Sequence, residues 1–444
     1  MPSRRNAAPA RPAPLVPRTA ACRCGRPVFF RNSECLACHT ALGYEPDSAR
    51  LLPLEPSGRP GLWVAATGRR RTPRWRRCAN LDTASGCNWL LPEADGAGSL
   101  CRSCRLTRTL PDLSIVEHQL WWGRIATAQR RLLSVLIALG LPTRSQVEDP
   151  QHGLAFDLLR QLPGGEPVMT GHADGVITLD VAEADDSQRE QRRHALGEPY
   201  RTLLGHLRHE SGHYYWQRLV DGTPWLAPCR ALFGDDRADY AAALQRHYAE
   251  GPAADWPQRH VSAYASCHPW EDWAETWAHY LHLVDTLDTA RGFALDGVPV
   301  ELHYERWAPA DLDTGDGGPA EDADAAQGFV DLVNGWMELT GVLNELSRSM
   351  GLADFYPFVL SRPALRKLHL VHRIVQAQRP QALLPPRQPS ARRQQLQPPL
   401  PGSATPAQNA LSTDSAGSID SNGNPAAGPA EAILTAPSGG PSGP

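Results

Sequence analysis

The cysteines constrain the fold of this chain more than any other feature. Eight of the ten lie between residues 22 and 104, in two groups of four. The segment between the groups is rich in Gly, Pro and Arg, so apolar packing alone would hardly fold it. Four thiolates complete one tetrahedral zinc site, and we expect two structural zinc ions here. The first group is Cys22, Cys24, Cys35 and Cys38, and the second is Cys78, Cys87, Cys101 and Cys104.

The N-terminal residues favour metal over disulfide bonds at these cysteines. Residues 1–21 are rich in Pro, Ala and Arg and lack the apolar stretch of a secretory signal, and no stretch of the chain reaches 18 apolar residues. The sequence therefore predicts a cytoplasmic protein without a membrane span, in which clustered cysteines hold metal more often than disulfides. Iron–sulfur clusters also use four thiolates, but their usual Cys runs are absent, so zinc is favoured.

Apolar periodicity predicts that the rest of the chain is mostly helical. Apolar side chains recur every three or four positions over residues 112–140, and Gly140 and Pro142 follow as a stop. Alternation over residues 174–182 predicts a strand. Further helices are expected at 186–195, 199–220, 235–249, 269–290, 323–350 and 362–376.

Residues 209–213 read His-Glu-Ser-Gly-His, the HExxH pattern. Positions i and i+4 share one face of a helix, so His209 and His213 could bind one zinc ion. Glu210 beside them could take a proton from a zinc-activated water as a general base. Chance alone produces the pattern in about a few of every hundred such chains, and a surface helix with two solvated histidines is the alternative.

A catalytic zinc needs a third protein ligand. Trp216 and Leu219 stand where the metzincin extension requires Gly and His, so that class is excluded. A second helix is expected from Pro269, with Glu271 and Glu275 on one face among tryptophans. Carboxylates are costly to bury unless a cation or hydrogen bonds compensate them, and a zinc site would do so. The alternative is that both carboxylates point to solvent.

Tyr264 and the run Glu-Asp-Trp-Ala-Glu at 271–275 resemble the second active-site segment of lethal-factor-type gluzincin peptidases. This resemblance implies that Glu271 is the third zinc ligand and that Glu275 supports the site from outside the ligand set. It also implies that Tyr264 stabilises the oxyanion.

Longer runs carry a second resemblance, at 170–178, 198–206, 209–216, 232–237 and 268–282. Together with the Cys-x-Cys-Gly and Cys-x-x-Cys pairs, they resemble a bacterial family of zinc-binding metallopeptidases with an N-terminal zinc-ribbon region. The resemblance spans about residues 20–375 and implies a peptide or protein substrate. One residue departs from it: Ser211 stands where an aliphatic residue is expected, although this is not a ligand position.

These observations predict an α+β protein in four parts. Residues 1–20 and the tail at 377–444, which is dominated by Pro, Gln, Ser, Ala and Gly, are expected to be disordered. Residues 21–110 form a zinc-ribbon region of short strands and loops with the two four-cysteine sites. Residues 111–376 form a mostly α-helical zincin-like domain with a small β-sheet and the one catalytic zinc.

Two further features bear on binding. The strand at 174–182 could hold an extended peptide along a sheet edge, or it could be an ordinary sheet strand. The four histidines near the motifs are expected to pack or to support ligands rather than bind metal: His206, His268, His279 and His282.

A binding module is the main rival to an enzyme. Arg69–Arg77 holds six arginines and one tryptophan, a composition that suits nucleic acid. A solvated basic loop is favoured for this run, and the net charge of -4 gives no overall case for nucleic acid. A second rival is a zinc-holding scaffold without turnover that binds a protein partner.

Overall fold

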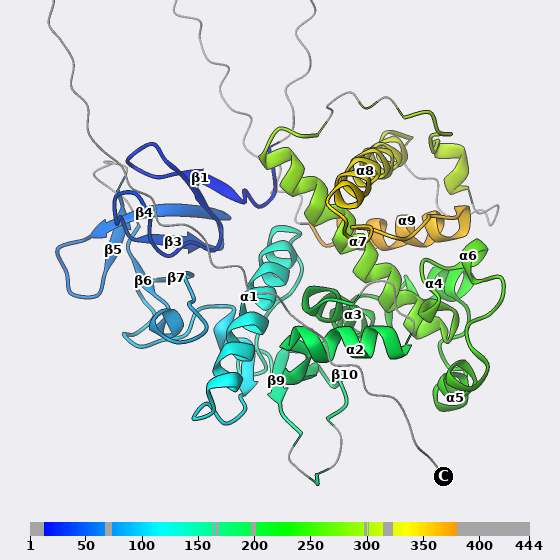
Figure 1. Cartoon of the computed structure of the whole chain (residues 1–444), viewed down its shortest axis with the longest axis horizontal. Coiled ribbons are helices and arrows are strands. Elements are labelled where there is room, and N and C mark those ends of the chain that lie inside the picture. The colour runs from blue at the N-terminus through cyan, green and yellow to red at the C-terminus, as the bar shows by residue number, and fades with distance from the viewer. Residues whose placement is uncertain are drawn as a thin grey trace, which may run out of the picture. The chain divides into compact units, whose positions relative to one another are not determined.

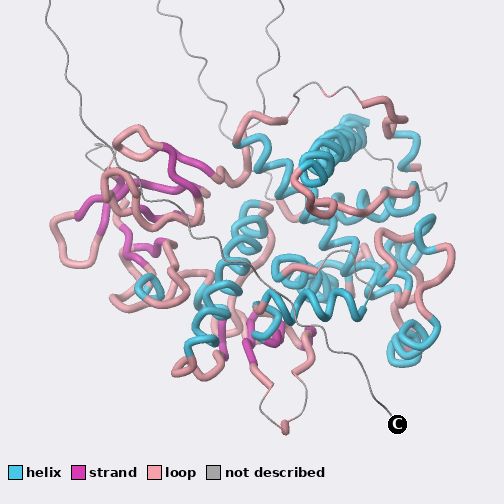
Figure 2. The backbone as a smooth tube through the Cα atoms, viewed as in Figure 1, coloured by secondary structure: helices cyan, strands magenta, loops and turns pink. Residues whose placement is uncertain are grey.

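Most strands lie in the N-terminal part of the chain, and the rest is mainly helical with a small sheet (Figure 2). The computed structural model describes residues 13–66, 73–161, 164–165, 168–196, 201–296, 300, 302–313 and 323–379. All of these belong to one compact unit, Met1–Pro385. The predicted α+β class, with a strand-rich ribbon region followed by a mainly helical region, is confirmed. The tail expected to be disordered lies outside the described residues from residue 380 onward.

The cysteine-rich region contains a two-stranded and a five-stranded antiparallel sheet. The first pairs β1 with β2, and the second has the order β3-β4-β5-β6-β7. Leu52, Leu54 and Leu90 of the larger sheet pack together in a small cluster, whereas Leu42, Leu51 and Leu91 belong to the main core. The strands are β1 (Thr19–Ala21), β2 (Pro27–Phe29), β3 (Leu42–Glu45), β4 (Arg50–Pro56), β5 (Trp63–Ala65), β6 (Trp75–Arg77) and β7 (Leu90–Pro92).

A four-stranded sheet of order β10-β11-β9-β8 belongs to the helical region. Its strands are β8 (Thr107–Thr109), β9 (Ala155–Leu159), β10 (Gly171–Ala173) and β11 (Val176–Asp180). β11 is the strand expected at 174–182. It pairs with β9 on one side and β10 on the other, so it is an inner strand, and the edge beside it is β10.

The expected helices are present, with shifted ends (Figure 1). The helix expected from residue 199 begins at Leu203, because the Thr202 side chain caps it by accepting from Gly205 N. α4 and α6 were not expected from the sequence. The helices are α1 (Val116–Ala138), α2 (Asp186–Leu196), α3 (Leu203–Tyr215), α4 (Leu226–Phe233), α5 (Tyr240–Glu250), α6 (Trp256–Arg259), α7 (Pro269–Gly292), α8 (Ala323–Ser349) and α9 (Arg362–Ala377).

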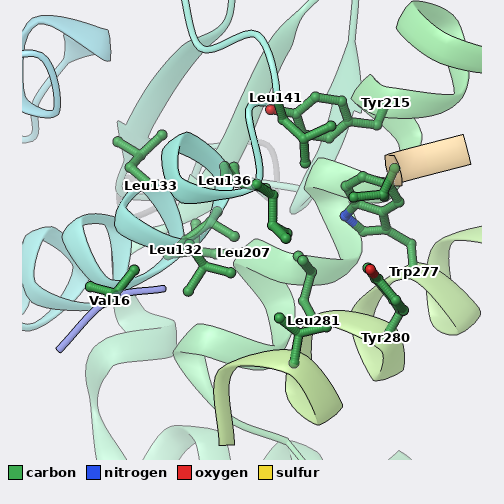
Figure 3. Packing of buried hydrophobic residues seen from close by; sticks show 14 of the residues in the cluster. Val16, Leu132, Leu133, Leu136, Leu141, Leu207, Tyr215, Trp277, Tyr280 and Leu281 are labelled. Carbon is green, nitrogen blue, oxygen red and sulfur yellow. The ribbon is translucent and has the colours of Figure 1, made fainter. Parts of the chain in front are cut away.

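The central core lies among α1, α3 and α7. Figure 3 shows Leu132 and Leu136 of α1 against Leu207 of α3 and Leu281 of α7. Val16 also packs in this core and is 1% exposed. Leu15, Val16 and Arg18, within the stretch expected to be disordered, are therefore in contact with the helices.

A buried ion cluster around Asp285 of α7 connects four parts of the chain. Its carboxylate accepts from Arg18 at 2.8 Å, from Arg131 of α1 at 2.7 and 2.8 Å, and from Arg208 of α3 at 2.6 Å. Burial alone would raise the pKa of Asp285, but the three guanidinium groups hold it well below its usual range. One turn further along α7, Asp288 accepts from the backbone N–H groups of Leu15 and Val16.

We predict that Asp285→Asn destabilises the protein severely. The substitution leaves three guanidinium groups around a neutral side chain, two of them buried, and removing one partner of a buried pair costs about 3–5 kcal/mol. The unfolding midpoint in a thermal melt should fall clearly. Asp235→Asn, which breaks the exposed pair with Arg237, is the matched control and should change the midpoint little. Equal midpoints for the two variants would contradict the role given to Asp285.

Candidate metal centre

The two helices that carry the predicted ligands approach each other unusually closely. A Cβ atom on Gly212 of α3 would lie 2.8 Å from Ala274 Cα of α7, so only glycine fits there. Trp273 Nε1 donates to Gly212 O at 2.8 Å, and Trp277 Nε1 donates to Ser211 Oγ at 3.1 Å. This second bond explains why a serine replaces the expected aliphatic residue at 211.

This packing brings three ligand atoms together. Glu271 Oε2 lies 2.9 Å from His209 Nε2 and 3.6 Å from His213 Nε2. Ligand atoms 2.0–2.2 Å from a tetrahedral zinc are about 3.4 Å apart, a separation that these two distances bracket. Glu271 Oε2 is buried and, despite the nearby histidine nitrogen, has no hydrogen-bond partner among the described residues. The atoms therefore converge on a common point, as metal ligands do.

The charges of the site also fit a cation. Glu210 and Glu271 are 7% and 1% exposed, and Glu275 lies beside them. Burial would raise the pKa of Glu271, but His209 and His213 outweigh it and hold that pKa well below the usual range. Anionic carboxylates in so small a buried space need compensating positive charge, which a divalent ion supplies.

Glu275 orients His209. Glu275 Oε1 lies 2.7 Å from His209 Nδ1, so the imidazole donates through Nδ1 and directs Nε2 toward the other ligands. Ser262 Oγ donates to the second oxygen, Oε2, at 2.6 Å. Ser262 was not found from the sequence, because its role depends on a loop that folds back onto α7.

Glu210 is the residue that the sequence predicts as a general base. It follows His209 on α3, is buried, and its Oε2 has no hydrogen-bond partner among the described residues. Burial is the main cause that raises the pKa of its carboxyl. A carboxylate held in this way gains more from taking a proton than a solvated one does.

Two tyrosines adjoin the ligands. Tyr264, in the turn η5 (Tyr264–Ser266), has its ring 5.9 Å from that of His209, and burial followed by the Glu271 charge raises its pKa. Tyr240, the first residue of α5, donates its hydroxyl to Glu271 Oε1 at 2.8 Å. Tyr240 was missed from the sequence. It follows the Leu-Phe-Gly-Asp-Asp-Arg run at 232–237, which carried part of the family resemblance.

The cysteines form the two groups expected from their order in the sequence. Within each group the four sulfur atoms lie within 4.8 Å of one another. The groups differ in burial: Cys24 of the first group is exposed and Cys38 partly exposed, whereas all four members of the second group are buried.

The four histidines near the motifs make contacts of other kinds. His268 caps α7 by accepting from Trp270 N, and its Nε2 is 3.0 Å from Ala238 O. His279 Nδ1 bonds the Tyr356 hydroxyl, and His282 Nδ1 lies near Arg208. His206 lies 3.6 Å from Glu183.

Comparison with known proteins identifies the class. Residues 118–374 match a family described as "putative zinc-binding metallo-peptidase", and residues 19–115 match a zinc-ribbon domain. The first match covers more than half of the chain, so the protein belongs to this family. Zinc binding is the property that both descriptions share.

Mycobacterial proteins are among its relatives. Uncharacterized proteins of Mycobacterium tuberculosis (strain H37Rv) and Mycobacterium bovis are each 43% identical over 353 residues, which are 79% of this chain and 93% of the relative. No solved structure matches the chain significantly. Within the described ranges, no helix has the length and apolar character that crossing a membrane requires.

We predict that the two four-cysteine groups lose metal in a fixed order. A chelator can reach the first group through the exposed Cys24, whereas the second group is enclosed. Alkylation of metal-loaded protein during chelator treatment, followed by peptide mass spectrometry, should label the first group earlier. Simultaneous labelling, or earlier labelling of Cys78 and its partners, would contradict this prediction.

Proposed function

We propose that the protein is a zinc-dependent metallopeptidase that hydrolyses peptide bonds. One observation carries the proposal: three potential ligand atoms converge on one point beside the buried carboxylate of Glu210, whose Oε2 has no hydrogen-bond partner among the described residues. A site that only held a structural ion would more often have four protein ligands and no such free carboxylate.

In this proposal His209, His213 and Glu271 hold the catalytic zinc, and each four-cysteine group holds a structural one. The catalytic ion, when bound, supplies a Lewis acid that polarises the scissile carbonyl and acidifies a water molecule. Thiol groups arranged as zinc ligands also need a reducing compartment, which supports a cytoplasmic location.

Glu210 moves the proton. Its free oxygen accepts a proton from the attacking water and later delivers it to the leaving amine. The raised pKa that burial gives this carboxyl suits both steps, because the group can then carry the proton between them.

Tyr264 acts on the substrate oxygen. A hydroxyl next to the ligands can donate a hydrogen bond to the oxyanion as it forms. Burial and the Glu271 charge raise the pKa of Tyr264, which keeps this hydroxyl protonated.

The edge strand β10 is our candidate for holding the peptide. It packs against α3, and its outer side has no strand partner among the described residues. An extended peptide could add to this edge through backbone hydrogen bonds. β11, the strand expected at 174–182, cannot do so because both of its sides are already paired.

The described arginines of Arg69–Arg77 give nucleic acid little support. Arg74 pairs with Glu93, and Arg77 donates to the carbonyls of Ser33 and Leu42. Trp75 is partly buried and packs against the cluster of Leu52, Leu54 and Leu90. Arg69, Arg70 and Arg71 lie outside the described residues. A peptide or protein therefore remains the favoured partner.

We predict that Glu210→Gln retains zinc but loses hydrolysis by about 10²–10⁴-fold, the usual contribution of general acid–base catalysis. The amide has nearly the same shape but cannot take the proton. The measurement is cleavage of a diverse peptide mixture, followed by mass spectrometry, with zinc per chain measured on the same samples. Cleavage by both proteins at equal rates would assign the activity to a contaminant or to another site.

Tyr264→Phe tests the oxyanion role. We expect turnover to fall by about 10²–10³-fold, as for the loss of one oxyanion donor, with zinc content unchanged. Steady-state kinetics on a cleaved peptide would measure the fall, which should appear in kcat. A variant that loses zinc, or that keeps full turnover, would remove Tyr264 from this role.

A further inference from the structure

The carboxylate of Glu271 has two oxygens in different surroundings. Oε2 faces His209 and His213, whereas Oε1 accepts from the Tyr240 hydroxyl at 2.8 Å. Glu271 comes from α7 and Tyr240 from α5, so this bond joins two helices at the ligand itself. It is the only hydrogen bond that the structure assigns to Oε1 among the described residues.

Tyr240 is held firmly at the start of α5. The Asp239 side chain caps this helix by accepting from Ala242 N at 3.0 Å, which fixes the first turn. The Tyr240 ring makes edge contacts with the rings of His268 and Trp270, at 5.3 and 5.7 Å between centroids. His268 and Trp270 lie at the start of α7, next to Glu271. The same segment therefore positions both the Tyr240 hydroxyl and the Glu271 carboxylate.

The loop between α4 and α5 also brings Tyr240 close to α7. Gly234, which ends α4, has a φ of 104°, a conformation that favours glycine. A Cβ there would lie 3.1 Å from Pro269 Cγ. His268 Nε2, 3.0 Å from Ala238 O, then ties the chain to α7 just before Tyr240. Local backbone and side chains thus direct Tyr240 onto Glu271.

We propose that Tyr240 is a positioning residue for the metal centre, which fixes Glu271 so that a single oxygen, Oε2, faces the ion. The inference rests on the proposed function, because it assigns Glu271 to a zinc ligand set. Partners that orient a ligand typically change metal affinity by about 10–100-fold when they are lost.

The loss of the hydroxyl would affect the ligand in two ways. Oε1 would be left in a buried position without its donor, and the carboxylate could rotate. Either oxygen could then face the histidines. Binding of the ion would have to stop this rotation of the carboxylate, which Tyr240 already prevents in the native protein, and the affinity for the ion would fall. The ribbon sites share no residue with this arrangement and should not respond.

The test compares Tyr240→Phe with Tyr248→Phe in the full chain. Phenylalanine keeps the ring contacts and removes only the hydroxyl, and Tyr248 is a control on the same helix that is 61% exposed. Zinc affinity is measured by competition with a calibrated chelator. The zinc bound by His213→Ala is the zinc held by the two ribbon sites. The zinc bound by a protein with His213 in excess of that amount is the third equivalent, which belongs to the site of His209, His213 and Glu271. Thermal melts accompany each titration.

We expect the third equivalent to bind about 10–100-fold more weakly in Tyr240→Phe, with ribbon zinc, the unfolding midpoint and Tyr248→Phe unchanged. A third-equivalent affinity equal to wild type would overturn the role of Tyr240 and leave the peptidase proposal intact. Parallel weakening of all zinc sites would also overturn it, because the effect would then be global. If wild type binds no more zinc than His213→Ala, the proposed function fails, and this inference fails with it.

Discussion

The candidate metal centre depends on the close packing of α3 against α7. Gly212 has no side chain, so Ala274 can lie directly against the backbone of α3. A larger residue at 212 would push the helices apart at the point where Glu271 must reach His209 and His213. Two indole donors, Trp273 and Trp277, then fix the rotation of one helix against the other. The ligand geometry is thus a consequence of packing between two helices, more than of any loop.

The same two helices also hold the N-terminal segment. Asp285 lies further along α7, and Arg208 immediately precedes His209 on α3, so the buried ion cluster joins the ligand-bearing helices a second time. Arg18 brings in the segment that leads directly into β1 and Cys22. The cysteine-rich region, α3 and α7 are therefore connected through one buried charge network. A substitution of Asp285 should destabilise all three.

The sequence predicts the parts of the site whose spacing follows a regular helix. His209 and His213 lie one turn apart, as do Glu271 and Glu275, and the helical period alone places each pair on one face. The two cysteine groups follow from proximity in the sequence. Tyr240 and Ser262 could not be found in this way, because each reaches α7 across a loop whose path is set by tertiary contacts. The edge position of β10 could not be predicted either. A three-residue strand is too short to show an apolar pattern, and its neighbours in the sheet depend on tertiary pairing.

The three proposed ligands of the catalytic ion differ in what orients them. His209 is held by the Glu275 carboxylate and Glu271 by the Tyr240 hydroxyl. His213 Nδ1 has no hydrogen-bond partner among the described residues, and its ring instead packs against Trp270 at 4.0 Å between centroids. Trp270 also contacts Tyr240, so one indole ring touches both the His213 ring and the tyrosine that holds Glu271. Trp270 therefore does more than fill space, since it connects the surroundings of two proposed ligands, His213 and Glu271.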